Sequence, residues 1–160
     1  MAIRNIRTDE DAVLRKKSRE ITKFDTKLKD LVEDMIETMY AADGIGLAAP
    51  QIGLLKRLIV IDLYDEEGVK VLINPEIIEE SGTQNEIEGC LSLPGKAGRV
   101  VRPFYVKVKG KDIDGNEVIM EGEDLLARAF CHEIDHLEGV LFTDKAVMVD
   151  FEEEEEEEEE

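Results

Sequence analysis

The sequence lacks any long apolar run. A helix that spans a bilayer needs about 20 consecutive apolar residues, and no such stretch occurs in the 160-residue chain. The first residues also lack the apolar segment, preceded by basic residues, that marks a secretion signal. We therefore expect a cytoplasmic protein that makes no contact with a membrane.

Cysteine and histidine are both scarce, with two residues of each. Cys90 and Cys131 are too few for a disulfide framework, and a chain of this length does not need one in order to fold. We expect both to be reduced thiols, so that at least one is free for chemistry. Any site that uses histidine must use His132 or His136, because the chain has no other.

Basic residues are few relative to acids. The chain has 20 Lys and Arg against 39 Asp and Glu, for a formal net charge of −19. The terminal run Glu152 to Glu160 contributes to this excess, but the rest of the chain is acidic without it. We therefore do not expect electrostatic binding to nucleic acid phosphates or to an anionic membrane. We also expect no sequence-specific nucleic-acid partner.

The composition is that of an ordinary globular protein, with 42% apolar and 37% charged residues. We find no internal repeat, and no linker before the terminal glutamates. We expect residues 1–151 to form one domain and residues 152–160 to form an acidic, disordered tail.

Two segments show the 3.6-residue apolar period of an amphipathic helix. The first begins at Asp25 or Thr26 and places six apolar residues on one stripe: Leu28, Leu31, Val32, Met35, Ile36 and Met39. The second runs from about Glu123 to Leu137, with Gly139 soon after its end. On its inner face we expect a buried stripe of four residues: Leu125, Ala129, His132 and His136.

Between these helices the pattern is that of strands. Residues 58–63 and 69–73 are β-branched apolar runs that flank the turn residues 65–68, which predicts a hairpin. Residues 105–109 alternate apolar and polar up to the turn residues 114–116. We therefore expect an α+β fold in which antiparallel or mixed sheets surround the helix in the C-terminal half.

That helix carries His132-Glu133-Ile134-Asp135-His136, an H-E-x-x-H pattern. Residues four apart lie on one helical face with Cβ atoms about 5 to 6 Å apart, so both imidazoles can reach one metal ion with Glu133 beside it. Asp135 lies off this face, and we do not expect it to be a ligand. Two histidines that simply pack in the core are the plainer alternative.

A catalytic metal site usually has three protein ligands and one open position, so a third ligand must come from elsewhere. Cys131 is a poor candidate, because a residue adjacent to His132 points about 100° away around the helix. Glu138 and Asp144 are the candidates downstream. Cys90, which lies between a glycine and a proline at an expected strand end, is the remaining one, although a buried free cysteine would look the same.

A third segment, Gly44 to Gln51, reads G-I-G-L-A-A-P-Q. Taken alone, it fits a tight connection between a helix and a strand. It has no lysine and is not a phosphate-binding loop. With all three segments in view, the chain resembles the peptide deformylase family, bacterial enzymes that remove formate from the N-terminus of new proteins.

The resemblance rests on Gly44 to Gln51, on Glu88 to Ser92 as E-G-C-L-S, and on His132 to His136 as H-E-x-D-H. Their order and spacing also match, and the likeness extends from about residue 3 to residue 145. It implies that residues 1–151 form a peptide deformylase-like catalytic domain that hydrolyses the N-formyl group of an N-terminal formyl-methionine.

The resemblance also implies the roles of individual residues. Cys90, His132 and His136 would bind one divalent metal ion, with water as the fourth ligand. The ion would be Fe²⁺ in cells, with Ni²⁺, Co²⁺ or Zn²⁺ as substitutes. The water would attack the formyl carbonyl, with Glu133 as general base and acid.

Two further groups are implied to stabilise the oxyanion, the side-chain amide of Gln51 and the backbone N–H of Leu91. The implied substrate-binding residues are Ile45, Gly46, Glu88 and Gly89. Formyl-Met nascent peptides would be the partners, with a transient contact to the ribosome. Some family members use a basic C-terminal helix for that contact, which a run of glutamates does not resemble.

Three of the arginines outside the motifs carry an expectation of their own. We expect Arg99 and Arg102 to be salt-bridged surface residues, with a contact to the peptide or to Glu88 as the alternative. Arg128 lies on the second helix, where apolar residues are common in the family and shape the methionine pocket. An arginine here would change the chemistry of that pocket, and a side chain that only extends to solvent at its edge is the plainer alternative.

Two other function classes stay open. One is a different metal-dependent amidase or peptidase with an H-E-x-x-H helix, which would take its third ligand downstream of His136. The other is a non-catalytic metal-binding protein, which would need a fourth protein ligand.

Overall fold

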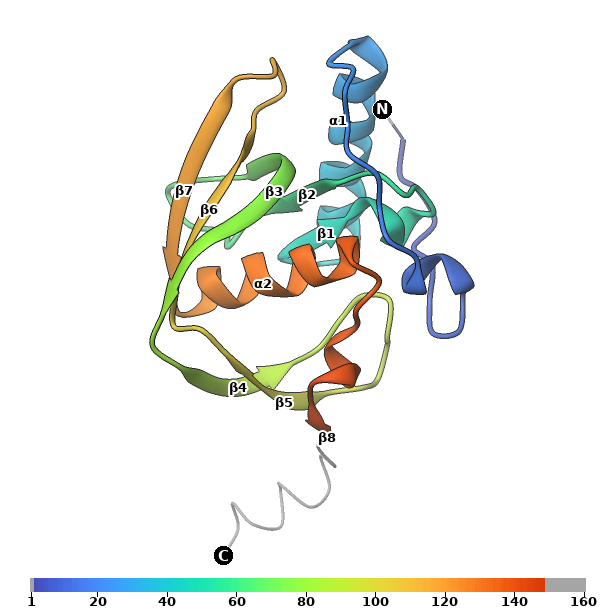
Figure 1. The fold of residues 1–160 in the computed structure, drawn as a ribbon. Coiled ribbons are helices and arrows are strands. Elements are labelled where there is room, and N and C mark those ends of the chain that lie inside the picture. The colour runs from blue at the N-terminus through green and yellow to red at the C-terminus, as the bar shows by residue number, and fades with distance from the viewer. Residues whose placement is uncertain (1, 149–160) are drawn as a thin grey trace, which may run out of the picture.

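The computed structural model describes residues 2–148 (Figure 1). The predicted acidic tail, residues 152–160, lies outside the described residues. Residues 2–148 form two α-helices, eight strands and three short 3₁₀ turns. Neither helix in this part of the chain is long and apolar enough to cross a membrane.

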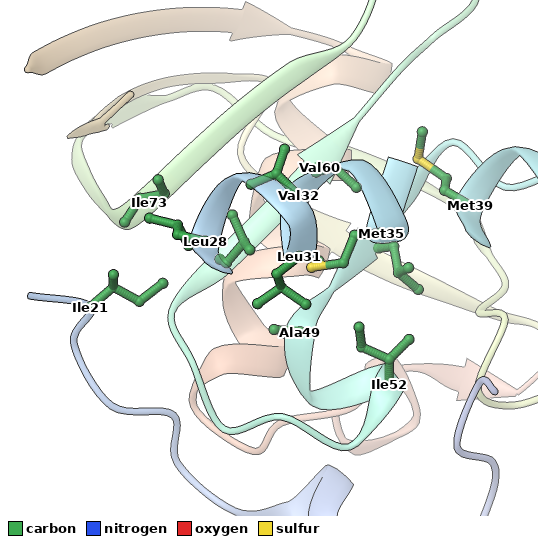
Figure 2. Close-up of a cluster of buried hydrophobic side chains, with 12 residues drawn as sticks. Ile21, Leu28, Leu31, Val32, Met35, Met39, Ala49, Ile52, Val60 and Ile73 are labelled. Atoms are coloured by element: carbon green, nitrogen blue, oxygen red, sulfur yellow. The ribbon is translucent and has the colours of Figure 1, made fainter. Parts of the chain in front are cut away.

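Helix α1 spans Thr26–Ala41 and begins where the sequence predicts. The Asp25 carboxylate accepts a hydrogen bond from the backbone N–H of Leu28 at 3.0 Å and so caps the helix. The predicted apolar stripe packs against the first strands and the turn that joins them (Figure 2). Together they form a core cluster of buried apolar side chains. Figure 2 labels ten of its members: Ile21, Leu28, Leu31, Val32, Met35, Met39, Ala49, Ile52, Val60 and Ile73.

A five-stranded antiparallel sheet has the order β1-β2-β3-β6-β7. Its strands are β1 (Gly46–Ala48), β2 (Leu58–Ile61), β3 (Lys70–Ser81), β6 (Tyr105–Lys111) and β7 (Glu117–Glu123). The predicted hairpin is confirmed, because β2 pairs with β3 in a register that places Leu58 opposite Ile73. Strand β1 forms one edge of this sheet.

A second sheet has the order β4-β5-β8 and is also antiparallel. It consists of β4 (Gln84–Glu88), β5 (Gly98–Arg102) and β8 (Val147–Met148). Strand β4 is an edge, as β1 is in the larger sheet. Helices and antiparallel sheets together confirm the expected α+β class.

Helix α2 spans Leu125–Leu137 and lies between the two sheets (Figure 1). It begins two residues later than predicted, because β7 continues to Glu123 and Asp124 then turns the chain with a φ of 55°. The apolar face of α2 packs against the five-stranded sheet through Phe130 and Leu137. The prediction that Leu125 is buried was wrong, since this first residue of the helix is 48% exposed.

Candidate metal centre and substrate groove

Three predicted ligands meet between α2 and the segment that follows β4. One donor atom from each of Cys90, His132 and His136 lies within 4.8 Å of the other two. The Cys90 Sγ is 3.4 Å from the His136 Nε2, close to the separation of about 3.6 Å that two such donors have on one tetrahedral ion. A thiolate and two imidazoles suit a transition-metal ion, so the residues present fit a metal.

Burial lowers the pKa of His136 well below its usual value. The ring is therefore neutral, which is the form that binds a metal. Its Nδ1 is buried and has no hydrogen-bond partner among residues 2–148. The other imidazole does have a partner, because His132 Nδ1 lies 2.8 Å from the Glu88 Oε1. This contact fixes how the ring lies, so that Nε2 is the nitrogen that His132 turns toward Cys90.

The Glu88 carboxylate is buried and is surrounded by donors. Arg102 binds both of its oxygens, at 2.9 and 3.0 Å, and Arg128 binds Oε2 as well. Burial alone would raise the pKa of Glu88, but the hydrogen bonds from His132 and Arg102 outweigh it and lower the pKa to about 2. Glu88 is therefore ionised and held as an anchor for the ring of His132.

The expected surface position of Arg102 was wrong, while the alternative given for it, a contact with Glu88, is confirmed. Arg102 is 3% exposed and binds Asp135 at 2.6 Å in addition to Glu88, so it is not a surface residue. Arg128 is 4% exposed and does not extend to solvent. Its guanidinium also donates to the Gln84 side chain at 3.1 Å and to a backbone carbonyl of β5 at 2.9 Å. A buried carboxylate needs paired charge, which these two arginines supply.

Gln51 lies in the 3₁₀ turn Ala49–Ile52, directly after β1. Its Oε1 accepts a hydrogen bond from the backbone N–H of Ala48 at 2.9 Å. That bond fixes the amide so that Nε2 faces Ser92 Oγ at 3.1 Å and Cys90 Sγ at 3.5 Å. The Gln51 amide therefore presents its N–H₂ group beside the three candidate ligands.

Glu133 lies on α2 with its carboxylate against the backbone of β1. A Cβ atom at Gly46 would overlap that carboxylate, so any other residue at this position would have to displace it. Burial raises the pKa of Glu133 to about 7. Its Oε1 is buried and has no hydrogen-bond partner in the described part of the chain. A buried oxygen without a partner beside three metal-ligand side chains is suited to exchange a proton with a bound molecule.

A groove of about 440 Å³ opens onto this cluster. Its walls include every substrate-binding residue predicted from the sequence, Ile45, Gly46, Glu88 and Gly89, together with Gln51, Cys90, Leu91, His132 and Glu133. Leu125, the exposed first residue of α2, is also a wall residue. The structure therefore brings together the side chains that the three sequence motifs contain.

The other ligand candidates lie outside the cluster. Glu138 pairs with Arg57 at 2.6 Å, and Asp144 pairs with Arg15 at 2.5 Å. Cys131 is buried among the apolar residues of α2, and burial raises the pKa of its thiol to about 11. Within residues 2–148, these three side chains therefore form ion pairs or pack in the core, and none of them joins the candidate metal centre.

Sequence reasoning missed three contributors to the site. Arg128 precedes His132 by four residues, so helical spacing alone places both on one face toward Glu88. Ser92, the last residue of E-G-C-L-S, accepts from Gln51. Phe142 stacks on the His132 ring with centroids 6.1 Å apart. No signal in the sequence pointed to Phe142.

An α+β fold with a Cys-His-His cluster, a flanking glutamate and an open groove is the arrangement of a metal-dependent hydrolase. Residues 3–152 match the family model described as polypeptide deformylase. The chain is 63% identical to a peptide deformylase of Alkaliphilus metalliredigens over 92% of its own length and 99% of that protein. It is 60% identical to peptide deformylase 1 of Clostridium acetobutylicum, over 91% and 95% of the two chains.

Solved structures agree with these relatives. A peptide deformylase from Thermotoga maritima superposes with a TM-score of 0.88 at 44% identity, over 92% of this chain and 99% of that one. One from Synechococcus elongatus, solved in complex with actinonin, gives a TM-score of 0.85 at 45% identity, over 89% and 79%. The chain belongs to the polypeptide deformylase family, enzymes that remove the N-formyl group from new polypeptides.

Proposed function

We propose that this enzyme hydrolyses the formamide of an N-terminal formyl-methionine and releases formate, with a divalent metal ion and the residues of the three motifs as its machinery. The observation that carries the proposal is the meeting of Cys90, His132 and His136, within 4.8 Å of one another, in a groove that Glu133 also lines. No other pair of histidines exists in the chain to form such a centre.

Cys90, His132 and His136 would hold the ion, which we propose to be Fe²⁺ in cells, with Ni²⁺, Co²⁺ or Zn²⁺ able to replace it. When bound, a divalent ion supplies Lewis acidity that polarises a carbonyl and lowers the pKa of water. Glu88 would orient His132 through the hydrogen bond at Nδ1. With three protein donors, the site keeps an open position, as a catalytic centre requires and a closed structural site does not.

Glu133 would act as the general base and acid. Its unpartnered Oε1 would accept a proton from the attacking water and return it to the departing amine. The proposed oxyanion donors are the Nε2 of Gln51 and the backbone N–H of Leu91, both in the wall of the groove. The hydrogen bond from Ala48 holds the Gln51 amide in advance, so the amide need not reorganise when negative charge develops.

The substrate would lie extended between two sheet edges. Ile45 and Gly46 lead into the edge strand β1, while Gly89 follows the edge strand β4. An edge strand offers backbone groups to an added peptide strand. The methionine side chain would enter the groove, where Leu125 provides exposed apolar surface.

We further propose that residues 1–151 are a single catalytic domain. Because formyl-methionine chains emerge from ribosomes, the enzyme would act in the cytoplasm and would meet the ribosome only transiently. The terminal glutamates would be repelled by ribosomal RNA and would not dock the enzyme there.

Formate release from formyl-Met-Ala-Ser tests the proposal. The assay is anaerobic, because a thiolate and iron are both open to oxidation, and it uses protein loaded separately with iron, nickel or zinc. We expect formate from this peptide and no cleavage of internal peptide bonds. Internal cleavage would favour a peptidase, and metal binding without formate from any loaded form would favour a non-catalytic metal protein.

A further inference from the structure

Tyr64 holds the backbone of one groove wall from behind. It follows β2, and its hydroxyl donates a hydrogen bond to the carbonyl oxygen of Gly44 at 2.7 Å. Gly44 lies in the connection between α1 and β1, where it lines the groove together with Asp43 and Ile45. Tyr64 is not itself a wall residue. A side chain outside the groove therefore fixes the backbone inside it.

The backbone of Tyr64 is in a conformation that a residue with a side chain seldom adopts. Its φ is 59°, in the left-handed region. The loop keeps this strain, because Asp62 Oδ1 accepts the backbone N–H of Tyr64 at 2.7 Å. Strained residues persist only where their surroundings determine them, and they gather at functional sites.

Asp62 is in turn held by Tyr40, near the C-terminal end of α1. The Tyr40 hydroxyl donates to Asp62 Oδ2, and the rings of Tyr40 and Tyr64 lie with centroids 5.9 Å apart. The hydrogen bond to Asp62 raises the pKa of Tyr40 to about 12, so its phenol stays a donor well above neutral pH. Helix α1 and the loop after β2 are thereby joined behind the groove wall.

The connection that carries Gly44 is fixed on its other sides as well. The Gly44 N–H donates to the Met39 carbonyl at 2.9 Å, and the Ile45 carbonyl accepts from the Asp62 N–H at 2.8 Å. Toward the centre, Gly44 packs on Leu91, since a Cβ there would lie 2.6 Å from Leu91 Cδ1. A shift of the Gly44 carbonyl would therefore displace the wall where Ile45 meets the groove.

We propose that Tyr64 is a positioning residue for the peptide chain of the substrate, acting through the carbonyl of Gly44, with Asp62 and Tyr40 holding it in place. This inference rests on the proposed function. Because Ile45 would lie along the peptide, the hydroxyl of Tyr64 serves the binding of residues that follow formyl-methionine. The chemical step, which uses groups on α2 and beside Cys90, depends on it far less.

Tyr64→Phe removes only the hydroxyl and provides the test. We expect KM for formyl-Met-Ala-Ser to rise about two- to tenfold, the effect of one net hydrogen bond, with kcat within about twofold of wild type. For formyl-methionine amide, which lacks the following residues, we expect KM to change less than about twofold. The matched control is Tyr105→Phe, which removes a hydroxyl bonded to Glu121 on the strand pair β6–β7. It should behave as wild type.

Tyr64→Gly separates positioning from stability. It loses the same hydroxyl and relieves the steric strain at a φ of 59°, and it also loses the ring contact with Tyr40. We expect it to show the same rise in KM as Tyr64→Phe, whatever the difference between the unfolding temperatures of the two variants. A KM that follows the unfolding temperature, or a Tyr64→Phe variant that matches Tyr105→Phe, overturns this inference alone. A wild-type protein that releases no formate overturns the proposed function and this inference together.

Discussion

The backbone of Gly46 lies directly against the carboxylate of Glu133, with no space for a Cβ atom between them. Glycine at this position of β1 thus sets how closely the proposed general base on α2 can approach the edge strand that borders the groove. The two residues come from different sequence motifs, and their contact joins those motifs in one site.

Gly46→Ala should therefore reduce turnover. The added methyl group must displace Glu133, so we expect kcat to fall at least about tenfold and stability to fall by about 1 to 3 kcal/mol, with metal content unchanged. Gly68→Ala is the control, because Gly68 has a φ of 71° in an open loop and its replacement also costs stability. An alanine at Gly46 that leaves kcat equal to that of the control would contradict the contact.

Arg128 should be necessary for both stability and metal affinity. Arg128→Met leaves the buried Glu88 without one of its two arginines, and we expect a loss of roughly 3 kcal/mol in the free energy of unfolding. We also expect a metal affinity about 10- to 100-fold weaker in competition with a chelator, because Glu88 orients His132. Arg15→Met breaks an exposed ion pair and should cost less than about 1 kcal/mol. Equal metal affinity in the two variants would exclude a role for Arg128 at the centre.

Gln51 and Ser92 should show graded effects on rate. Gln51→Ala removes a proposed oxyanion donor, and we expect kcat for formyl-Met-Ala-Ser to fall about 10²- to 10³-fold. Ser92→Ala removes only an acceptor that holds the same amide, and we expect a smaller fall. Steady-state kinetics on protein of equal metal content measures both. A larger effect at Ser92 than at Gln51 would show that the amide is not the donor.

The sequence predicted the elements that depend on short-range pattern. The apolar stripe of α1 and its cap at Asp25 follow from helical period and from the side chain of one residue. The hairpin β2–β3 follows from two apolar runs and a turn. The ligand set came from the family resemblance, since spacing along the chain left Cys90, Glu138 and Asp144 as open candidates.

The arginines show what local pattern does not contain. The sequence offered a contact with Glu88 only as an alternative for Arg102 and not at all for Arg128, because these ion pairs join β4, β5 and α2. A charged side chain usually lies at the surface, but Arg102 and Arg128 are buried because they pair with the buried carboxylate of Glu88. The prediction that Leu125 is buried failed for the opposite reason, because apolar character does not always indicate a buried position. An apolar residue on the helical stripe remains exposed because the groove opens at the first turn of α2.

Tyr40 should ionise late, which can be measured directly. The protein has three tyrosines and no tryptophan, so the ultraviolet absorbance of phenolate reports them without interference. The hydrogen bond to Asp62 raises the pKa of Tyr40 from 10.0 to about 12. A raised pKa in the folded state stabilises the fold below pH 10, and this contribution is lost as the pH rises from 10 toward 12. The hydrogen bond to Glu121 raises the pKa of Tyr105 to about 12 as well. Tyr40→Phe should therefore remove one of two late-titrating phenols, and an unchanged upper part of the titration would contradict the contact.

The most direct test of the whole account is the variant Glu133→Gln, assayed for bound metal and for formate in the same preparation. We expect one metal ion per chain, as in wild type, because the proposed ligands are Cys90, His132 and His136. We also expect formate release from formyl-Met-Ala-Ser to fall by about 10²-fold or more, the rate effect typical of a general base. Full metal content with turnover close to that of wild type would contradict the central role of Glu133.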